Sequence, residues 1–232
     1  MTSVLLHGFT GSPQSVVAMA DCAPMPCWSP TLPGHCGTDC GADFFDTADR
    51  VARQVENAGH AGAQVVAYSL GARIALSLLV DRPELFSSAI LIGCHFGLRS
   101  LEARRQRRDR DRTWIELLRR DGIETFVQRW ESLPIFSTQS PELRAAQRPV
   151  RSSHAAAGLA RSLETAGLAE MPSYWPKLAA IEIPVELLTG ELDGKFSALA
   201  REAVSHNVRI AHRVVSGVGH NVAAEEPKSV WR

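Results

Sequence analysis

Short apolar runs recur along the chain, and stretches with helical periodicity separate them. Each run is brief, rich in leucine or β-branched residues, and ends at Gly, His or Ser, which is typical of β-strands. The second, third and fourth are almost continuously apolar, as in strands buried on both faces of a parallel sheet. Helices are predicted at 46–57 and 70–80, and the alternation predicts an α/β fold with an open, mostly parallel sheet flanked by helices. The predicted strands are 3–8, 63–69, 88–93, 184–190 and 209–217.

The middle of the chain breaks this alternation. Between 95 and 177 no convincing strand is found, and amphipathic helical segments take its place, at 101–120, 123–130, 141–147 and 155–168. An insertion that follows the carboxyl end of a central strand lies over the crevice where open α/β sheets bind ligands. We therefore expect a core made of 1–94 and 178–232, and a helical cap made of 95–177.

Composition excludes several classes of function. The 232 residues carry 25 basic and 25 acidic side chains, so no overall positive charge points to nucleic acid. No run of 18 apolar residues occurs, and the amino terminus lacks a basic region followed by an apolar one. The odd number of cysteines favours reduced thiols. We expect a cytoplasmic protein without membrane insertion, with the oligomeric state open and a monomer favoured.

Four cysteines fall close together near the amino terminus and raise the question of a zinc site. Their spacings are C-x4-C and C-x3-C, prolines are interleaved, and no CxxC pair occurs. Ligand spacing therefore argues against zinc, and we expect neither a metal nor a cofactor. The four residues are Cys22, Cys27, Cys36 and Cys40.

The first candidate for chemistry is Ser69. In Ala67-Tyr68-Ser69-Leu70-Gly71 small residues flank the serine as in the G-x-S-x-G pattern, with alanine in place of the first glycine. The segment follows a buried type of strand and opens a helix, which is the setting of a strained nucleophile elbow. The alternative is that Ser69 only caps the helix at 70–80, since serine is a favoured N-cap.

An activated serine needs a base and an acid that orients the base. Asp193 and His220 follow Ser69 in the order of this fold, and each lies in a loop after a predicted strand. We therefore predict a catalytic triad of Ser69, Asp193 and His220. Glu191 lies in the same loop as Asp193 and is the less favoured acid.

The segment His7-Gly8-Phe9-Thr10-Gly11 directly follows the first predicted strand. In this fold the loop after that strand and the residue after the nucleophile each supply a backbone N–H to an oxyanion hole. We expect the two donors to be Phe9 and Leu70. The alternative is a simple glycine turn.

Several longer motifs resemble one family over residues 3 to about 227: HGFTGS, LPGHCG, AYSLGAR, GLRSLEARRQRRDRDRTW, FVQRWESLPIF, TGELDGKF and GVGHN. The family is that of 2-succinyl-6-hydroxy-2,4-cyclohexadiene-1-carboxylate synthase, an α/β-hydrolase-fold lyase of menaquinone and phylloquinone biosynthesis. Esterases share the short motifs, but the arginine-rich stretch and the tryptophan motif after it are particular to this family.

The resemblance implies elimination of pyruvate from 2-succinyl-5-enolpyruvyl-6-hydroxy-3-cyclohexene-1-carboxylate, with Ser69 as a base. It implies substrate contacts at Tyr68, Arg73, Arg107, Trp130 and Arg151. Guanidinium groups suit a small anionic polycarboxylate substrate, although a structural role for any one arginine stays open. Two alternatives stay open as well: a serine carboxylesterase that forms an acyl-enzyme, and a protein that only binds ligands on this fold.

Three positions depart from the family pattern. Ser15-Val16-Val17 stands where the family has a tryptophan, Cys36 replaces a glycine, and Phe96 replaces a proline. We expect these changes to reshape the edges of the pocket. His95 and His154, in or near the predicted cap, are expected to be solvated polar residues rather than pocket residues.

Overall fold

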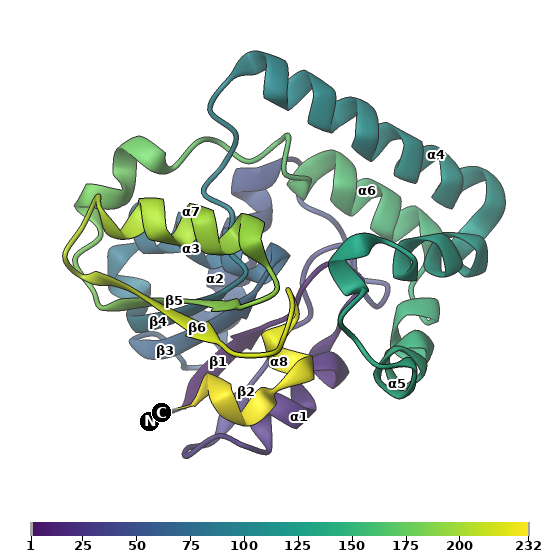
Figure 1. Ribbon diagram of the computed structural model, residues 1–232. Coiled ribbons are helices and arrows are strands. Elements are labelled where there is room, and N and C mark those ends of the chain that lie inside the picture. Colours follow the sequence, from purple (N-terminus) through teal and green to yellow (C-terminus); the bar gives the residue numbers. More distant parts are fainter. Residues whose placement is uncertain (1, 232) are drawn as a thin grey trace.

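The computed structural model describes residues 2–231 and confirms the α/β fold with a parallel sheet (Figure 1). Six strands lie in the order β2-β1-β3-β4-β5-β6, and every neighbouring pair is parallel. All carboxyl ends therefore meet at one edge of the sheet. The strands are β1 (Ser3–Leu6), β2 (Cys27–Trp28), β3 (Ala63–Tyr68), β4 (Phe86–Ile92), β5 (Val185–Gly190) and β6 (Ile210–Val215).

Helices connect the strands, and short 3-10 turns join several of them. The α-helices are α1 (Val17–Ala20), α2 (Phe44–Asn57), α3 (Leu70–Asp81), α4 (Leu101–Glu131), α5 (Pro141–Ser152), α6 (Ala156–Ala166), α7 (Gly194–Val204) and α8 (Val222–Glu225). The 3-10 turns are η1 (Pro13–Val16), η2 (Pro83–Leu85), η3 (Pro134–Phe136), η4 (Trp175–Ala180) and η5 (Pro227–Val230).

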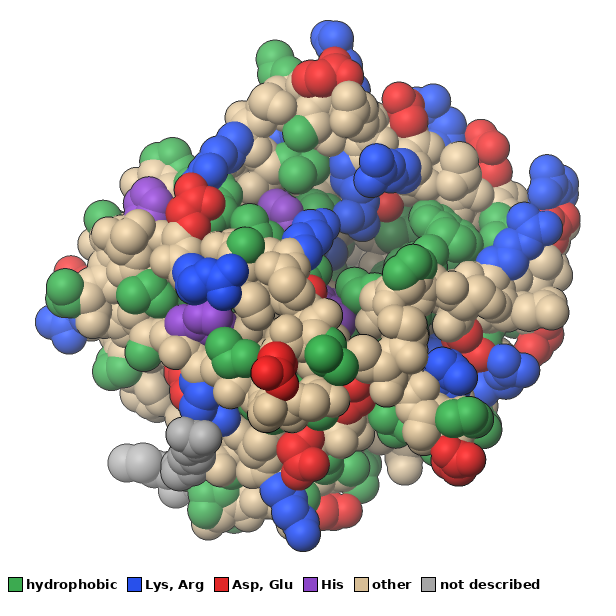
Figure 2. Space-filling model, viewed as in Figure 1, with side chains coloured by type: hydrophobic (Ala, Val, Ile, Leu, Met, Phe, Trp, Pro, Cys, Tyr) green, Lys and Arg blue, Asp and Glu red, His purple; other side chains and the backbone are tan. Residues whose placement is uncertain are grey.

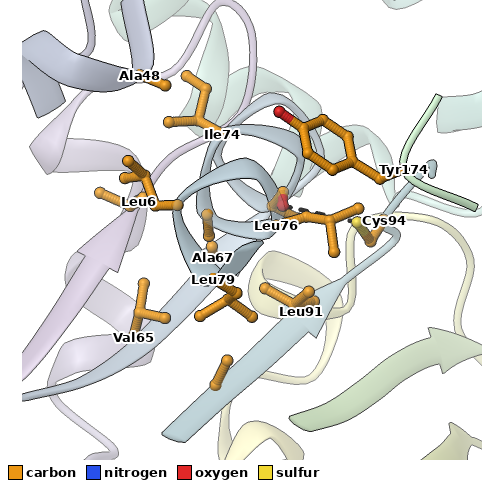
Figure 3. Close-up of a cluster of buried hydrophobic side chains, with 14 of the residues drawn as sticks. Leu6, Ala48, Val65, Ala67, Ile74, Leu76, Leu79, Leu91, Cys94 and Tyr174 are labelled. Atoms are coloured by element: carbon orange, nitrogen blue, oxygen red, sulfur yellow. Dashed lines mark hydrogen bonds between the residues drawn. The ribbon is translucent and has the colours of Figure 1, made fainter. Parts of the chain in front are cut away.

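The two faces of the sheet bury alternate residues of each strand, as a period of two requires. Leu6 and Ala67 face α2, α3 and α7 in the larger cluster of the core, part of which Figure 3 shows around α3. Leu5 and Val66 face the opposite side, where α1 and α8 cover the sheet. Burial on both faces explains why the central strands read as unbroken apolar runs.

The segment between β4 and β5 contains α4, α5 and α6, which lie above the carboxyl edge of the sheet (Figure 1). We call these three helices and their connections the cap. Helices α4 and α6 pack on each other and share an apolar cluster. Helix α4 is broken at Gly122, whose φ of 77° is left-handed, so its two halves run in different directions. The boundaries of the cap at 95 and 177 stay our proposal.

Strand β2, helices α1 and α7, and the 3-10 turns were not predicted. Strand β2 has only Cys27 and Trp28 and lies among prolines, so it carries no run long enough to show a period. Helix α7 was read as part of a loop because Gly190 and Gly194 mask its start. Asp193 caps this helix, with Oδ1 accepting a hydrogen bond from the Phe196 amide at 3.3 Å. Among residues 2–231 no helix is long and apolar enough to cross a membrane.

Candidate active site

Ser69 lies on the sharp turn between β3 and α3. Its backbone is left-handed, with φ 52° and ψ −103°, a strained conformation for a residue with a side chain. The turn is tight because a Cβ at Gly71 would come within 2.6 Å of the Leu6 carbonyl oxygen. Ser69 occupies the N-cap position of α3, but its side chain makes no capping hydrogen bond to the helix, so capping does not account for the hydroxyl.

His220 and Asp193 lie beside this serine, each on a loop that follows a strand. His220 Nδ1 is 2.7 Å from Asp193 Oδ2, and His220 Nε2 is 3.4 Å from Ser69 Oγ. The carboxylate can only accept, so Nδ1 carries the proton and Nε2 is free to accept one from the serine. The ring of His220 is buried and packs on Phe196, 4.4 Å between ring centroids. The three side chains thus have the geometry of an activated serine.

The alternative acid, Glu191, has other partners. Its Oε2 accepts hydrogen bonds from Ser216 Oγ at 2.7 Å and from the Gly217 amide at 2.8 Å. These two bonds lower the pKa of the exposed Glu191 carboxyl. Glu191 therefore fixes the turn after β6, and Asp193 is the acid that contacts His220.

The absence of a side chain at Gly93 leaves space for the imidazole ring of His220. Its φ is 57°, and a Cβ there would lie 2.6 Å from His220 Cε1. We expect Gly93→Ala to displace the ring and to slow phosphonylation of Ser69 by a fluorophosphonate probe about 100-fold, as small misplacements of catalytic groups do. Labelling is followed by mass spectrometry, and thermal melting reports the fold.

Gly62→Ala is the matched control for this variant. Gly62 has a φ of 79°, but no atom lies within 4 Å of a Cβ placed there. Gly62→Ala should lower the free energy of unfolding by about 1 kcal/mol, as Gly93→Ala does through its left-handed backbone. Its Ser69 should react with the probe at the wild-type rate. Equal labelling of Gly93→Ala and wild type would show that His220 does not need this space.

The two expected oxyanion donors are on adjacent turns. Leu70 is the first residue of α3, where helical amides have no partner within the helix. Phe9 lies in the turn from Gly8 to Gly11, which the Gly11 amide closes on the Gly8 carbonyl at 3.0 Å. Within the described part of the chain, neither the Phe9 nor the Leu70 amide donates to a protein acceptor. Both amides are thus available to a ligand oxygen.

A cavity of about 770 Å³ opens above Ser69, between the core and the cap. Figure 2 shows the hollow, with basic side chains gathered along its upper edge beneath α4. The structure brings every predicted site residue to this one cavity: Phe9, Tyr68, Ser69, Leu70, Arg73, Arg107, Trp130, Arg151, Asp193 and His220.

One wall of the cavity is aromatic. Trp130 packs on Phe9 at 5.3 Å and stacks on Phe126 at 5.4 Å, and Trp114 and Phe136 extend the same wall. The indole Nε1 of Trp130 is buried and has no partner among the described residues. A buried donor without an acceptor is costly, so this group is a candidate contact for a ligand oxygen.

Another part of the cavity wall is basic, and we call it the basic wall. Arg73 is partly buried, and its Nη1 donates a hydrogen bond to the Ala166 carbonyl at 2.9 Å. Burial and the nearby Arg107 lower the pKa of Arg73 to about 10. Arg107 itself pairs with the buried Asp111, with Nε 2.9 Å and 3.0 Å from the two carboxylate oxygens. Arg73 is therefore the less compensated charge of the two.

Arg151 is held differently from Arg73. It is buried, it pairs with the buried Glu131 at 3.0 Å, and its guanidinium lies 4.9 Å from the ring centre of Phe136. A buried ion pair of this kind fixes the side chain in place. Arg151 thus combines a structural ion pair with a position on the cavity wall.

Sequence reasoning missed several wall residues. Lys195 and Arg110 both line the cavity. Lys195 lies on the first turn of α7, where desolvation and then Arg107 lower its pKa. It was missed with α7 itself, although a basic residue two positions after Asp193 was a usable signal. Across residues 2–231 no three His, Cys, Asp or Glu side chains are grouped so as to hold a metal ion.

The expectation for the cap histidines was wrong. His95 is buried on the cavity wall, its Nδ1 accepts a hydrogen bond from the Gly97 amide at 3.1 Å, and burial lowers its pKa to about 3. His154 is buried as well. Both lie where the cap meets the core, which a helical pattern alone does not reveal.

Comparison with known proteins gives one consistent result. The model of the alpha/beta hydrolase family matches residues 4–232. A Klebsiella pneumoniae (strain 342) protein named 2-succinyl-6-hydroxy-2,4-cyclohexadiene-1-carboxylate synthase is 31% identical, over 98% of this chain and 89% of its own. A Bacillus subtilis (strain 168) protein that carries this name provisionally is 34% identical, over 97% of this chain and 85% of its own.

Solved structures agree with these relatives. The structure of MenH from S. aureus superposes with a TM-score of 0.91 and 26% identity, covering 99% of this chain and 90% of its own. A thermophilic esterase from Thermogutta terrifontis gives a TM-score of 0.81 at 22% identity, covering 99% of this chain and 86% of its own, and shows the fold alone.

Proposed function

The chain belongs to the 2-succinyl-6-hydroxy-2,4-cyclohexadiene-1-carboxylate synthase family of the alpha/beta hydrolases, and we propose that it acts as a lyase in menaquinone biosynthesis. Its substrate would be 2-succinyl-5-enolpyruvyl-6-hydroxy-3-cyclohexene-1-carboxylate, from which it eliminates pyruvate. The observation that carries this proposal is the set of basic side chains that line the same cavity as Ser69.

The charge of the wall supports a polycarboxylate substrate. Arg107 and Arg151 are each paired with an acid, Asp111 and Glu131. Arg73, Arg110 and Lys195 line the same cavity and have no acidic partner within 4 Å in residues 2–231. A cavity wall with uncompensated cations binds carboxylates, because guanidinium and ammonium groups form charge-assisted hydrogen bonds to them. The substrate brings three carboxylates, on the ring, the succinyl chain and the enolpyruvyl group.

The triad supplies the base. Asp193 holds the proton on His220 Nδ1, and Nε2 takes the hydroxyl proton of Ser69. The Ser69 oxygen then removes a ring proton of the substrate instead of attacking a carbonyl. No covalent bond forms between enzyme and substrate.

Removal of the ring proton leaves a negative charge on the ring carbon. This charge is delocalised onto the oxygen of the succinyl carbonyl, with which the ring carbon is then conjugated. The amides of Phe9 and Leu70 stabilise this oxyanion, since both are free of protein acceptors. The ring carbon–oxygen bond to the enolpyruvyl group then breaks. The leaving group takes a proton from the protonated His220 and is released as pyruvate, and Ser69 keeps the ring proton, so the triad returns to its starting state.

The alternative reaction is hydrolysis of a small ester through an acyl-enzyme at Ser69. The same triad and amides would serve it, so the walls of the cavity decide between the two reactions. An apolar acyl chain is accommodated by the aromatic wall but leaves Arg73, Arg110 and Lys195 without partners. The basic wall therefore favours elimination.

The test is a coupled assay in which lactate dehydrogenase reports pyruvate release, run beside hydrolysis of p-nitrophenyl acetate. We expect pyruvate release with a kcat/KM within the usual enzymatic range, about 10⁴ M⁻¹s⁻¹ or more. Ester hydrolysis should be at least about 100-fold less efficient, because the ester makes none of the ionic contacts. Fast ester turnover without pyruvate release would overturn the proposal.

Lys195 gives a separate prediction about binding. We expect Lys195→Gln to raise KM for the polycarboxylate about 10-fold with kcat little changed, because loss of an ion pair at a partly exposed wall weakens binding of substrate and transition state alike. The salt dependence of kcat/KM should become shallower as well.

Lys177→Gln is its control. Lys177 pairs with Asp81 at 3.3 Å and does not line the cavity. The control should leave KM and its salt dependence unchanged. An unchanged KM in Lys195→Gln would remove Lys195 from the substrate site.

A further inference from the structure

Three buried histidines lie beside the oxyanion loop, and the mechanism above uses none of them. His7 directly follows β1, His35 lies in the loop after β2, and His154 lies in the cap between α5 and α6. The ring centroids of His7 and His35 are 5.1 Å apart, and those of His35 and His154 are 5.3 Å apart. This histidine cluster therefore joins the cap to the core and contacts the turn from Gly8 to Gly11.

The hydrogen bonds of the cluster fix two tautomers. His7 Nε2 accepts from the Leu32 amide at 3.1 Å, so the proton is on Nδ1, which donates to the Gly8 carbonyl at 2.9 Å. His154 Nδ1 accepts from the Cys36 amide at 3.1 Å, so Nε2 donates to the Thr10 carbonyl at 3.1 Å. Both rings are neutral, and burial lowers the pKa of each, that of His7 to about 4.

The bonds from His7 and His154 hold the carbonyls of Gly8 and Thr10, the two residues that flank Phe9. The Gly8 carbonyl and the Phe9 N–H belong to one trans peptide group and point in opposite directions. Because His7 Nδ1 and the Gly11 amide both hold the Gly8 oxygen, they also aim the Phe9 N–H. The Thr10 carbonyl, two peptide groups further along the turn, is held by His154 of the cap.

The turn needs this support. Thr10 has a left-handed φ of 64°, which is unfavourable for a β-branched residue and persists only where neighbours hold it. Thr10 is buried, so its carbonyl also cannot exchange the His154 bond for one to solvent without opening the structure. Loss of the donor at His154 would let the turn relax and carry the Phe9 amide with it.

We propose that His154 is a positioning residue for the oxyanion hole: by donating from Nε2 to the Thr10 carbonyl, it keeps the Phe9 amide aimed at the developing oxyanion. The donor comes from the cap, so the hole is complete only when the cap is seated on the core. The proposal rests on the proposed function only in its use of the Phe9 amide as an oxyanion donor.

The test separates the two hydrogen bonds of the ring. In His154→Gln the side-chain amide nitrogen reaches the place of Nε2 and can still donate to the Thr10 carbonyl. In His154→Asn the shorter amide reaches the place of Nδ1, so it can hold the Cys36 amide but not Thr10. His154→Leu removes both bonds at similar volume.

Two rates are measured for each variant: phosphonylation of Ser69 by a fluorophosphonate probe, and kcat with KM for pyruvate release. Removing an oxyanion donor costs about 10²–10³ in rate, and displacing one costs less, so we expect about 30-fold losses in labelling and in kcat for Asn and Leu. KM should stay within about 2-fold, since the ground-state contacts are untouched, and Gln should stay within about 3-fold of wild type in every quantity. Melting temperatures show whether each variant folds. If His154→Leu does not fold, the comparison of His154→Gln with His154→Asn still tests the proposal.

Three results would overturn the proposal. Wild-type labelling and kcat in Asn would show that the Thr10 bond is not needed. A rise in KM at constant kcat would show that His154 only seats the cap over the substrate. Equal losses in Gln and Asn would show that the ring matters for packing alone. Normal labelling with no pyruvate release from the wild type would contradict the proposed function and leave the positioning role intact, because the probe needs no natural substrate.

Discussion

Ser69→Ala is expected to lower the rate of pyruvate release by about three to four powers of ten. The methyl group can neither lose a proton to His220 nor take one from the substrate, and a positioned base contributes about 10²–10⁴ to a rate. Removal of a triad serine elsewhere costs as much or more. The residual rate would come from the amides of Phe9 and Leu70 and from the basic wall, which the substitution leaves in place.

The measurement is a single-turnover assay of pyruvate release, together with the affinity of the variant for the ring product. Affinity should be nearly unchanged, because the hydroxyl does not carry the carboxylate contacts. Ser205→Ala is the matched control, since Ser205 is exposed and its hydroxyl donates only to the Glu202 carbonyl at 2.7 Å. Near-normal release by Ser69→Ala would rule out the serine as base.

Asp193→Asn is expected to cost about 10³–10⁴ in kcat with a folded protein. The new amide can donate to His220 Nδ1, which moves the imidazole proton to Nε2 and leaves no acceptor for the Ser69 hydroxyl. Asparagine also caps helices well, so the cap on α7 survives and stability should change by less than about 1 kcal/mol. A pH–rate profile and thermal melting are the measurements.

Glu191→Gln is the matched control for this variant. Glu191 lies two residues away in the same loop, but it bonds Ser216 and Gly217 instead of the histidine. We expect it to keep kcat within about 2-fold. If the two variants behaved alike, or if Glu191→Gln were the more damaged, the assignment of Asp193 as the orienting acid would be wrong.

The core and the placement of the three proposed catalytic residues could be predicted because they depend on local rules. Strands buried on both faces read as apolar runs, and parallel strands bring all their carboxyl ends to one edge. Ser69, Asp193 and His220 each follow a strand of this parallel sheet, so their positions after predicted strands were enough to bring them together. Strand β2, with two residues, shows no pattern and was missed for that reason.

The electrostatics of the site could not be predicted in the same way. A sequence shows that Arg107 and Arg151 are basic, but not that Asp111 and Glu131 already neutralise them. The burial of the histidines was not predicted for a related reason. A polar residue is assigned to the surface unless its hydrogen-bond partners are known. Those partners lie far along the chain: His154 is held by Thr10 and Cys36.

The three departures from the family pattern have different structural consequences. Val16 lines the cavity, as expected of a change at its edge. Phe96 does not: it is buried in the core and packs on Trp175 at 4.9 Å, so the expectation for this position was wrong. Cys36 has a φ of 48°, a conformation that a glycine adopts without strain, which accounts for the family's preference there.

The cap enters the chain between β4 and β5, as one continuous insertion, and it supplies part of the cavity wall, including Arg107, Trp130 and Arg151. The three proposed catalytic side chains lie outside it, each in a turn or loop after a different strand. Substitutions in α4 or α5 can therefore change which molecules the cavity binds without changing the residues that transfer protons. Substrate selection and catalysis can in this way evolve partly independently. His154 limits this modularity, since any replacement cap would have to bring its own donor to Thr10.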